Sequence, residues 1–347
     1  MKELSFFLGA NTYRGFFSLY EEYMDIWKGS RVWILKGGAG CGKSGFMRTV
    51  GERVSSVGYT VYRILCSGDP SSLDGIHIPE LGVILFDGTS PHVLEPPTVG
   101  DRGFYLDLSR FYRPGVPDLS GLDGNCKEHY RRAYRWTASA GEVEASLALP
   151  PDVEVTVRRK AVSLIARELH AKTSKTGRVL KIFTDAFTGD GMLSMEETCR
   201  ELASRRIGLR GICGGEHIFL SSAAEAAHAR GWDTVLALSP LDPQRIAHLF
   251  IPEIGLMIGS GEGDRYIHLD RIVYQKTGRD EAARIRDSES MRLALLSRAR
   301  KELALARHHH DILEQAVNPY VDFAGVHEAA ETFAAGLLEN VSPETET

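Results

Sequence analysis

The glycine-rich segment at residues 37–44 carries the most specific chemistry in the chain. It satisfies the phosphate-binding pattern GxxxxGK[ST] in full. In such a loop the backbone amides turn toward phosphate oxygens, the lysine bridges the β- and γ-phosphates, and the hydroxyl ligates Mg²⁺. The residues expected to bind the nucleotide are Gly37, Gly38, Ala39, Gly40, Cys41, Gly42, Lys43 and Ser44. Lys43 is also a catalytic candidate, and Ser44 a magnesium ligand.

The segments on either side of this loop have the patterns that would position it. Residues 31–36, RVWILK, are β-branched, aromatic and apolar, which is typical of a buried strand. After the loop, residues 44–57 have the periodicity of a helix, with apolar side chains at Phe46, Met47, Val50 and Val54. A strand, a glycine loop and a helix in this order place the loop amides at the positive end of the helix dipole.

A second strand signal ends in an acid. Residues 81–88, LGVILFDG, form an apolar run that closes on Asp87, as in a strand buried on both faces. An aspartate at the carboxyl end of such a strand is placed to hold the magnesium shell, although alone it could simply be a turn residue. Together with the upstream loop, it is predicted to be a magnesium ligand and a catalytic residue.

The base that would activate a nucleophile is left open by the sequence. Asp87 is followed by Gly88, so no glutamate stands beside it to orient a hydrolytic water. Candidates near in sequence are Asp69, Asp74, Glu80 and His92. Each of these residues also has a plain structural interpretation as a turn or capping residue.

The chain contains an internal repeat. At a constant offset of 173, residues 38–87 and 211–260 share 12 of 50 residues, concentrated in the segments around Asp69-Pro70 and Ile78-Pro79-Glu80. An earlier block, 7–19, matches 183–195 at an offset of 176. Ordered matches in both blocks predict two copies of one α/β unit, an intrachain pseudo-dimer.

The second copy lacks the chemistry of the first. Glu216 and His217 stand opposite Lys43 and Ser44, and Ser260 stands opposite Asp87. A carboxylate facing a triphosphate costs Coulomb energy where a lysine supplied it. The second copy is therefore predicted to be a pseudo-site with a regulatory or structural role. Only Arg210, if its side chain pointed inward, would supply a cation there.

The fold expected from these signals is a duplicated three-layer α/β/α P-loop sheet with a helical hairpin after each copy. The predicted parts are an active P-loop domain at 1–115, a helical insertion at 116–177, a degenerate P-loop-like domain at 178–277, a helical hairpin at 278–341 and a disordered tail at 342–347. Within the long C-terminal helix, His310 and Glu314 are the only well-spaced metal-binding pair, and an ordinary helix surface is the favoured interpretation.

Composition limits the possible partners. A net charge of −5 and a pI near 6.2 argue against nucleic acid, and no run of about 18 apolar residues is present to span a membrane. Five scattered cysteines without CxxC spacing fit a reduced compartment. We expect a cytoplasmic protein of about two domains.

The chain also resembles the bacterial tandem P-loop ATPases, an uncharacterised family built as two homologous nucleotide-binding halves. The resemblance is carried by GANTYRGF (9–16), LKGGAGCGKS (35–44), residues 72–96 and the HHHDILEQ helix (from 308). It implies ATP as the nucleotide and Lys43, Ser44 and Asp87 as the ATP and magnesium residues. Members with two intact loops differ from this chain, whose second loop carries Glu216 and His217.

Three functions remain open from the sequence. The first is a Mg-dependent ATPase in which the first repeat hydrolyses ATP. The second is a P-loop kinase for a small molecule or nucleoside, favoured by the missing glutamate after Asp87. The third is a non-hydrolysing nucleotide sensor that acts through a protein partner. No guanine-recognition motif of the NKxD type is evident, which favours ATP over GTP.

Overall fold

The computed structural model describes residues 4–89, 93–147, 149–172, 177–275 and 279–339. The chain folds into two compact units. The first unit contains residues 1–9, 18–130 and 303–347, and the second contains residues 10–17 and 131–302. Two long helices, α3 (Ser120–Ala145) and α8 (Arg279–Val317), each contribute residues to both units.

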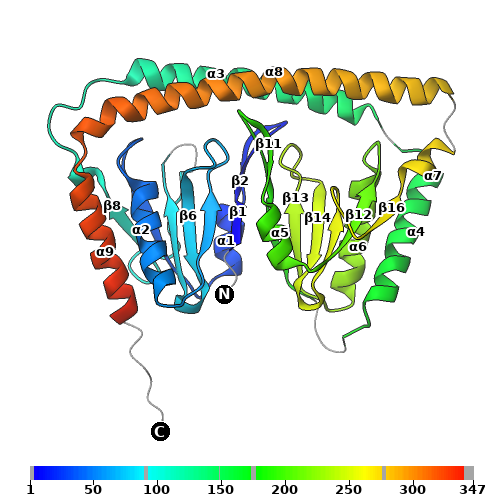
Figure 1. Cartoon of the computed structure of the whole chain (residues 1–347), viewed down its shortest axis with the longest axis horizontal. Coiled ribbons are helices and arrows are strands. Elements are labelled where there is room, and N and C mark those ends of the chain that lie inside the picture. Colours follow the sequence, from blue (N-terminus) through cyan, green and yellow to red (C-terminus); the bar gives the residue numbers. More distant parts are fainter. Residues whose placement is uncertain (1–3, 90–92, 148, 173–176, 276–278, 340–347) are drawn as a thin grey trace, which may run out of the picture. The chain divides into compact units, whose positions relative to one another are not determined.

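The first unit is built on a six-stranded mixed sheet (Figure 1). Its strands in spatial order are β1 (Leu4–Phe7), β5 (Tyr62–Leu65), β6 (Leu73–Ile78), β7 (Val83–Asp87), β4 (Arg31–Lys36) and β8 (Gly103–Asp107). Strand β6 runs antiparallel to both of its neighbours, whereas β7, β4 and β8 are parallel to one another. The strand predicted at 31–36 is present with those bounds, the one predicted at 81–88 covers Val83–Asp87, and the two are adjacent.

Helices lie on both faces of this sheet. On β7, Leu85 belongs to the core shared with α2 (Lys43–Ser56), and the next residue, Phe86, packs edge-on against Tyr20 of α1 (Tyr20–Ile26), 5.1 Å between ring centroids. Successive side chains of a strand point to opposite faces, so α1 and α2 cover opposite sides. The α/β class predicted from the sequence is confirmed.

The second unit repeats this topology. Its strands in spatial order are β9 (Val179–Ile182), β13 (Thr234–Leu238), β14 (Ile246–Ile251), β15 (Leu256–Gly259), β12 (Arg205–Arg210) and β16 (Arg265–His268). The order and the parallel or antiparallel sense of every pair match those of the first sheet. The remaining elements correspond as well: α5 (Glu196–Leu202) to α1, α6 (Gly215–Ala229) to α2, the 3₁₀ turn η3 (Pro252–Ile254) to η1 (Pro79–Leu81), and hairpin β10–β11 (Asp185–Thr188, Gly191–Ser194) to β2–β3 (Gly9–Thr12, Gly15–Ser18). The predicted duplication is confirmed.

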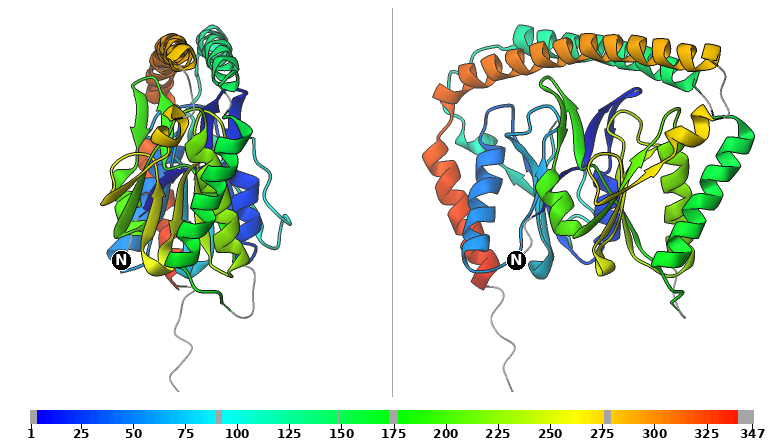
Figure 2. Two further views of the ribbon diagram at one scale, coloured as in Figure 1. Left: turned by 90° about the vertical axis from the view of Figure 1, so that its right-hand side faces the viewer. Right: turned by 45° about the vertical axis from the view of Figure 1, so that its right-hand side comes forward.

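The helices that follow each copy differ from the predicted hairpins. Within the second unit, α4 (Pro151–Glu168) packs lengthwise on α6, and within the first unit α9 (Phe323–Glu339) packs lengthwise on α2 (Figures 1 and 2). The turn at η4 (Asn318–Tyr320) directs α9 onto α2, where Phe333 packs against Phe46. The expectation of an antiparallel α8–α9 hairpin was wrong because the apolar face of α9 is buried on the α/β core instead.

A buried histidine lies between the sheet and α1. His77 on β6 is fully buried, and its Nδ1 shares a 2.7 Å hydrogen bond with the Tyr23 hydroxyl. Its Nε2 has no partner among the described residues. Burial lowers the pKa of His77 to about 3, because the charged form of the ring loses its contact with water.

His77 should therefore make stability depend on pH. Below about pH 6.5 the unfolded chain takes up a proton at this site and the folded chain does not, so the free energy of unfolding falls as pH decreases from about 6.5 toward 3. The expected slope from this residue is about 1.4 kcal/mol per pH unit. Urea denaturation of wild type and His77→Phe between pH 7.5 and 5 measures it. Equal slopes for the two proteins would contradict a neutral, buried His77.

Candidate phosphate-binding site

The loop at residues 37–42 joins the carboxyl end of β4 to the first turn of α2. Gly42, the residue before the helix, has a φ of 90°, a left-handed conformation that a residue with a side chain rarely adopts. Lys43 is only 7% exposed, and its ammonium donates to the carbonyl oxygens of Gly37 at 2.9 Å and Gly38 at 2.8 Å. The lysine therefore lies inside the loop that it would use to hold phosphate.

Asp87 completes a charged pair with this lysine. Strands β4 and β7 are paired with Leu35 opposite Asp87, and the Asp87 Oδ2 lies 3.7 Å from Lys43 Nζ. The other carboxylate oxygen accepts hydrogen bonds from the backbone and the hydroxyl of Thr89. Burial raises the pKa of Asp87 above its usual value, and the positive charge of Lys43 opposes that shift.

Ser44 ties the start of α2 to the antiparallel strand beside it. Its hydroxyl oxygen accepts the backbone N–H of Leu73 at 3.0 Å. The next residue on β6, Asp74, is 4% exposed and accepts the Tyr20 hydroxyl at 2.8 Å. The negative charge of Asp74 contributes to the raised pKa of Asp87. A second buried acid therefore lies close to the lysine–aspartate pair.

The four candidates for a base have different surroundings. Asp74 lies within electrostatic reach of Asp87, as described above. Asp69 is held by Arg307 at 2.9 Å and by Ser71. Glu80 faces the Thr60 backbone N–H at 3.3 Å, next to the start of β5. His92 falls outside the described residues.

The glycines of the loop allow close contacts that side chains would prevent. A β-carbon on Gly37 would lie 2.5 Å from Cys41 Sγ, and one on Gly38 would lie 2.9 Å from the Tyr112 hydroxyl. A close backbone cradle, one hydroxyl and one carboxylate fit a phosphate with Mg²⁺, which takes few protein ligands and completes its shell from phosphates and water. Within the described residues, no group of three His, Cys, Asp or Glu side chains is placed to hold a metal ion.

The second loop preserves the backbone contacts of the first. Where Ser44 accepts the N–H of Leu73, His217 Nδ1 accepts the N–H of Ile246 at 3.1 Å, and both pairs are related by the offset of 173. This match supports the pairing of Lys43 with Glu216. The loop before Glu216 is one residue shorter, because β12 ends at Arg210 and β4 ends at Lys36.

Glu216 turns its carboxylate back into its own loop. Its Oε1 accepts the Gly211 backbone N–H at 2.9 Å, and burial raises the pKa of this acid. A pocket of about 280 Å³ opens beside it, lined by Glu216, Ser260 and Asp270 among others. Arg210 also lines this pocket, but its guanidinium lies over the Tyr266 ring, 4.7 Å from the centroid. At the position where the first loop carries a lysine, the second loop therefore carries a carboxylate that accepts a hydrogen bond from its own backbone amide.

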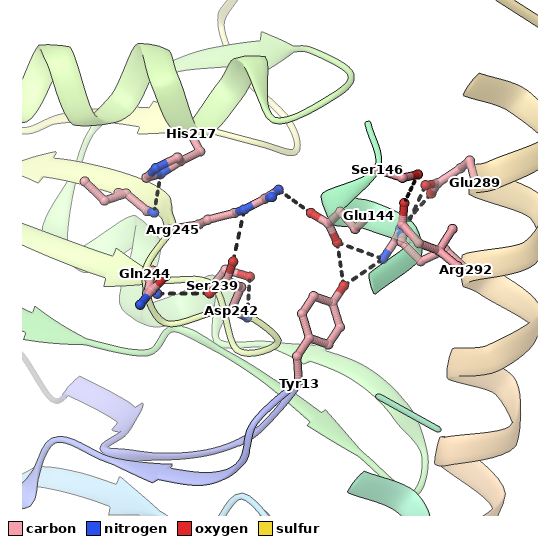
Figure 3. A network of polar contacts seen from close by, with 12 residues as sticks. Tyr13, Glu144, Ser146, His217, Ser239, Asp242, Gln244, Arg245, Glu289 and Arg292 are labelled. Carbon is pink, nitrogen blue, oxygen red and sulfur yellow. Dashed lines mark hydrogen bonds and ion pairs between the residues drawn. The ribbon is translucent and has the colours of Figure 1, made fainter. Parts of the chain in front are cut away.

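A network of charges lies beside the second loop (Figure 3). Arg245, whose Nη1 would be 3.6 Å from a β-carbon on Gly214, pairs with Glu144 and with Asp242 at 3.1 Å. Glu144 also accepts the Tyr13 hydroxyl at 2.5 Å and lies 3.8 Å from Arg292. The positive charge of Arg245 is therefore already shared by two carboxylates.

Comparison of the chain with family models, with curated proteins and with solved structures finds no match. In the described part of the chain, no helix has the length and apolar character needed to cross a membrane. The evidence for a phosphate site is therefore the sequence and the geometry of the loops.

Sequence reasoning missed the residues that cover the first loop. Tyr112 lies against Gly38 and donates to the Ala39 carbonyl at 3.3 Å, and Glu314 lies against Gly40. Glu314 had one signal, its four-residue spacing from His310, but that spacing says nothing about the loop. Their positions depend on tertiary packing that no local pattern encodes.

The network around Glu144 should stabilise the second unit. Glu144→Gln removes a carboxylate that is 24% exposed and leaves Arg245 and Arg292 partly buried with less compensation. We expect the free energy of unfolding to fall by about 1–3 kcal/mol. Urea denaturation followed by circular dichroism measures the change.

A matched control for this substitution is Glu281→Gln, because Glu281 pairs with Arg284 in a solvent-exposed ion pair. Exposed pairs of this kind contribute little to stability. The midpoint of urea unfolding of the control should equal that of wild type. Indistinguishable unfolding of Glu144→Gln and the control would contradict a stabilising role for the network.

Proposed function

We propose that the first unit is a P-loop domain that binds Mg²⁺–ATP at residues 37–44 and hydrolyses it. The observation that carries this proposal is the placement of Lys43, at the start of a helix that follows a glycine loop, 3.7 Å from Asp87 on the adjacent parallel strand. This is the arrangement that phosphate and magnesium binding require. ATP as the nucleotide rests on the family resemblance.

Each residue of the site has a distinct task in this proposal. The Lys43 ammonium exchanges the carbonyl oxygens of Gly37 and Gly38 for phosphate oxygens, while the loop amides bind the remaining phosphate oxygens. Ser44 and Asp87 would hold Mg²⁺. The ion, when bound, neutralises negative charge that develops on the phosphates during transfer. Asp74 is buried within electrostatic reach of Asp87 and adds negative charge that favours a bound cation.

A non-hydrolysing nucleotide sensor is the second candidate. It is favoured by the contacts of the loop with two helices, because α8 lies against Gly40 and α9 lies against Gly42. Binding or release of a nucleotide at the loop would therefore alter the contacts of both helices directly. If the protein binds ATP but releases no phosphate with any partner tested, a sensor is favoured over an ATPase.

Lys43→Ala should abolish ATP hydrolysis, because it removes the only cation among the described residues that hydrogen-bonds to the loop carbonyls. We expect the rate to fall by about 100-fold or more. Phosphate release from ATP, GTP, CTP and UTP measures this, with Lys28→Ala, at an exposed lysine, as the control. Hydrolysis by Lys43→Ala at the wild-type rate would contradict the proposal. If the wild-type protein consumes ATP only when a small-molecule acceptor is added, the protein is a kinase.

The pseudo-site predicts a binding stoichiometry. Glu216 places a carboxylate on the Gly211 amide, and Ser260 replaces the acid that would hold magnesium. We expect isothermal titration calorimetry with Mg²⁺–ATP to give one nucleotide per chain. Two sites per chain, or one site that survives Lys43→Ala, would contradict the assignment of the first loop as the competent one.

A further inference from the structure

The carboxyl-terminal turns of α8 lie directly on the phosphate loop. A β-carbon on Gly40 would lie 3.2 Å from the α-carbon of Glu314, so the helix backbone touches the loop at this residue. Gly40 has a φ of 71°, and its lack of a side chain is what permits the approach. Leu313 and Val317 anchor this end of α8 in the same core as α2. The contact is thus part of the packed first unit.

The start of α9 covers the adjacent part of the loop. A β-carbon on Gly42 would lie 3.2 Å from Val326 Cγ1 and 3.5 Å from Phe323 Cδ1. Val326 is buried in the shared core, whereas Phe323 remains largely exposed. The loop is therefore enclosed by apolar groups on one side and approached by an acidic residue, Glu314, on the other.

Glu314 lies against Gly40, close enough for its charge to interact with groups that a phosphate would use. Its partner on α8, His310, lies 3.3 Å away. The hydrogen bond from His310, the backbone N–H of Gly40 and the positive charge of Lys43 together lower the pKa of Glu314 below its usual value. Glu314 is therefore ionised at neutral pH, and an anion faces the loop without any nucleotide.

We propose that Glu314 acts as an internal anion that occupies the Gly40 amide of the phosphate loop and must be displaced before a nucleotide can bind. This inference rests on the proposed function and deepens it. A phosphate and a carboxylate cannot both accept the same N–H, and their like charges repel near one lysine. Displacement of Glu314 would also loosen α8 from Gly40, so nucleotide binding and the position of this helix end are linked.

The central test compares affinities. Glu314→Gln removes the charge and keeps the shape of the side chain, and Glu328→Gln removes the same charge from an exposed site on α9. The dissociation constants of Mg²⁺–ATP and of inorganic tripolyphosphate are measured for both variants and wild type. We expect Glu314→Gln to bind both probes about 5- to 10-fold more tightly and Glu328→Gln to bind them as wild type does.

Other outcomes of this comparison overturn the inference. Unchanged or weaker binding by Glu314→Gln means that the carboxylate does not compete with phosphate. Unchanged affinity with slower turnover would assign Glu314 to the reaction itself. Equal tightening by Glu328→Gln would show only a general effect of net charge.

A measurement without nucleotide separates this inference from the proposed function. Hydrogen exchange of the Gly40 amide should be faster in Glu314→Ala than in wild type, while the Gly82 amide, bonded to the Pro79 carbonyl, should be unaffected. If ATP binds but the exchange of Gly40 is unchanged, the inference alone fails. If neither ATP nor tripolyphosphate binds any of these proteins, the proposed function fails and the inference fails with it.

Discussion

The interaction on which the site depends is the burial of the Lys43 ammonium inside its own glycine loop, beside Asp87. A buried cation requires compensation, and the chain provides it with two loop carbonyls and a carboxylate 3.7 Å away. These partners come from the loop that follows β4 and from the end of β7, so the parallel pairing of the two strands is a condition for the charge pair. The rest of the first unit serves to hold that pairing: α2 packs on one face of the sheet and α1 on the other.

The duplication shows what happens when this charge is reversed. The second unit keeps the strand order, and His217 takes over the backbone contact that Ser44 makes in the first unit. Its loop nevertheless carries Glu216, which accepts an amide of its own loop. The same backbone plan therefore supports a cationic loop in one copy and an acidic loop in the other. The proposed role of Glu314 adds a related feature to the first copy, an acidic residue that lies against the loop at Gly40 and belongs to a separate helix.

Local patterns predicted the loop, its flanking strand and helix, and the strand that ends at Asp87, because each depends on residues close together in sequence. The duplication was predicted from residue matches at a constant offset of 173. The long helix expected within residues 278–341 is present as α8, Arg279–Val317. The hairpins were predicted wrongly, since an apolar stripe shows that a helix is buried but not which element covers it. The same limit explains why Glu314 and Tyr112 were not found, and why Asp74 could not be ranked above Asp69 before the contacts of Tyr20 and Arg307 were known.

The central claim is that the first loop is the one phosphate site of a duplicated chain. The most direct test is a crystal structure of the full chain grown with Mg²⁺ and a non-hydrolysable ATP analogue. The account predicts triphosphate density against residues 37–44, magnesium between Ser44 and Asp87, and Glu314 withdrawn from Gly40. Triphosphate density at residues 211–217, or an empty first loop with Lys43 still bonded to Gly37 and Gly38 at saturating analogue, would contradict it.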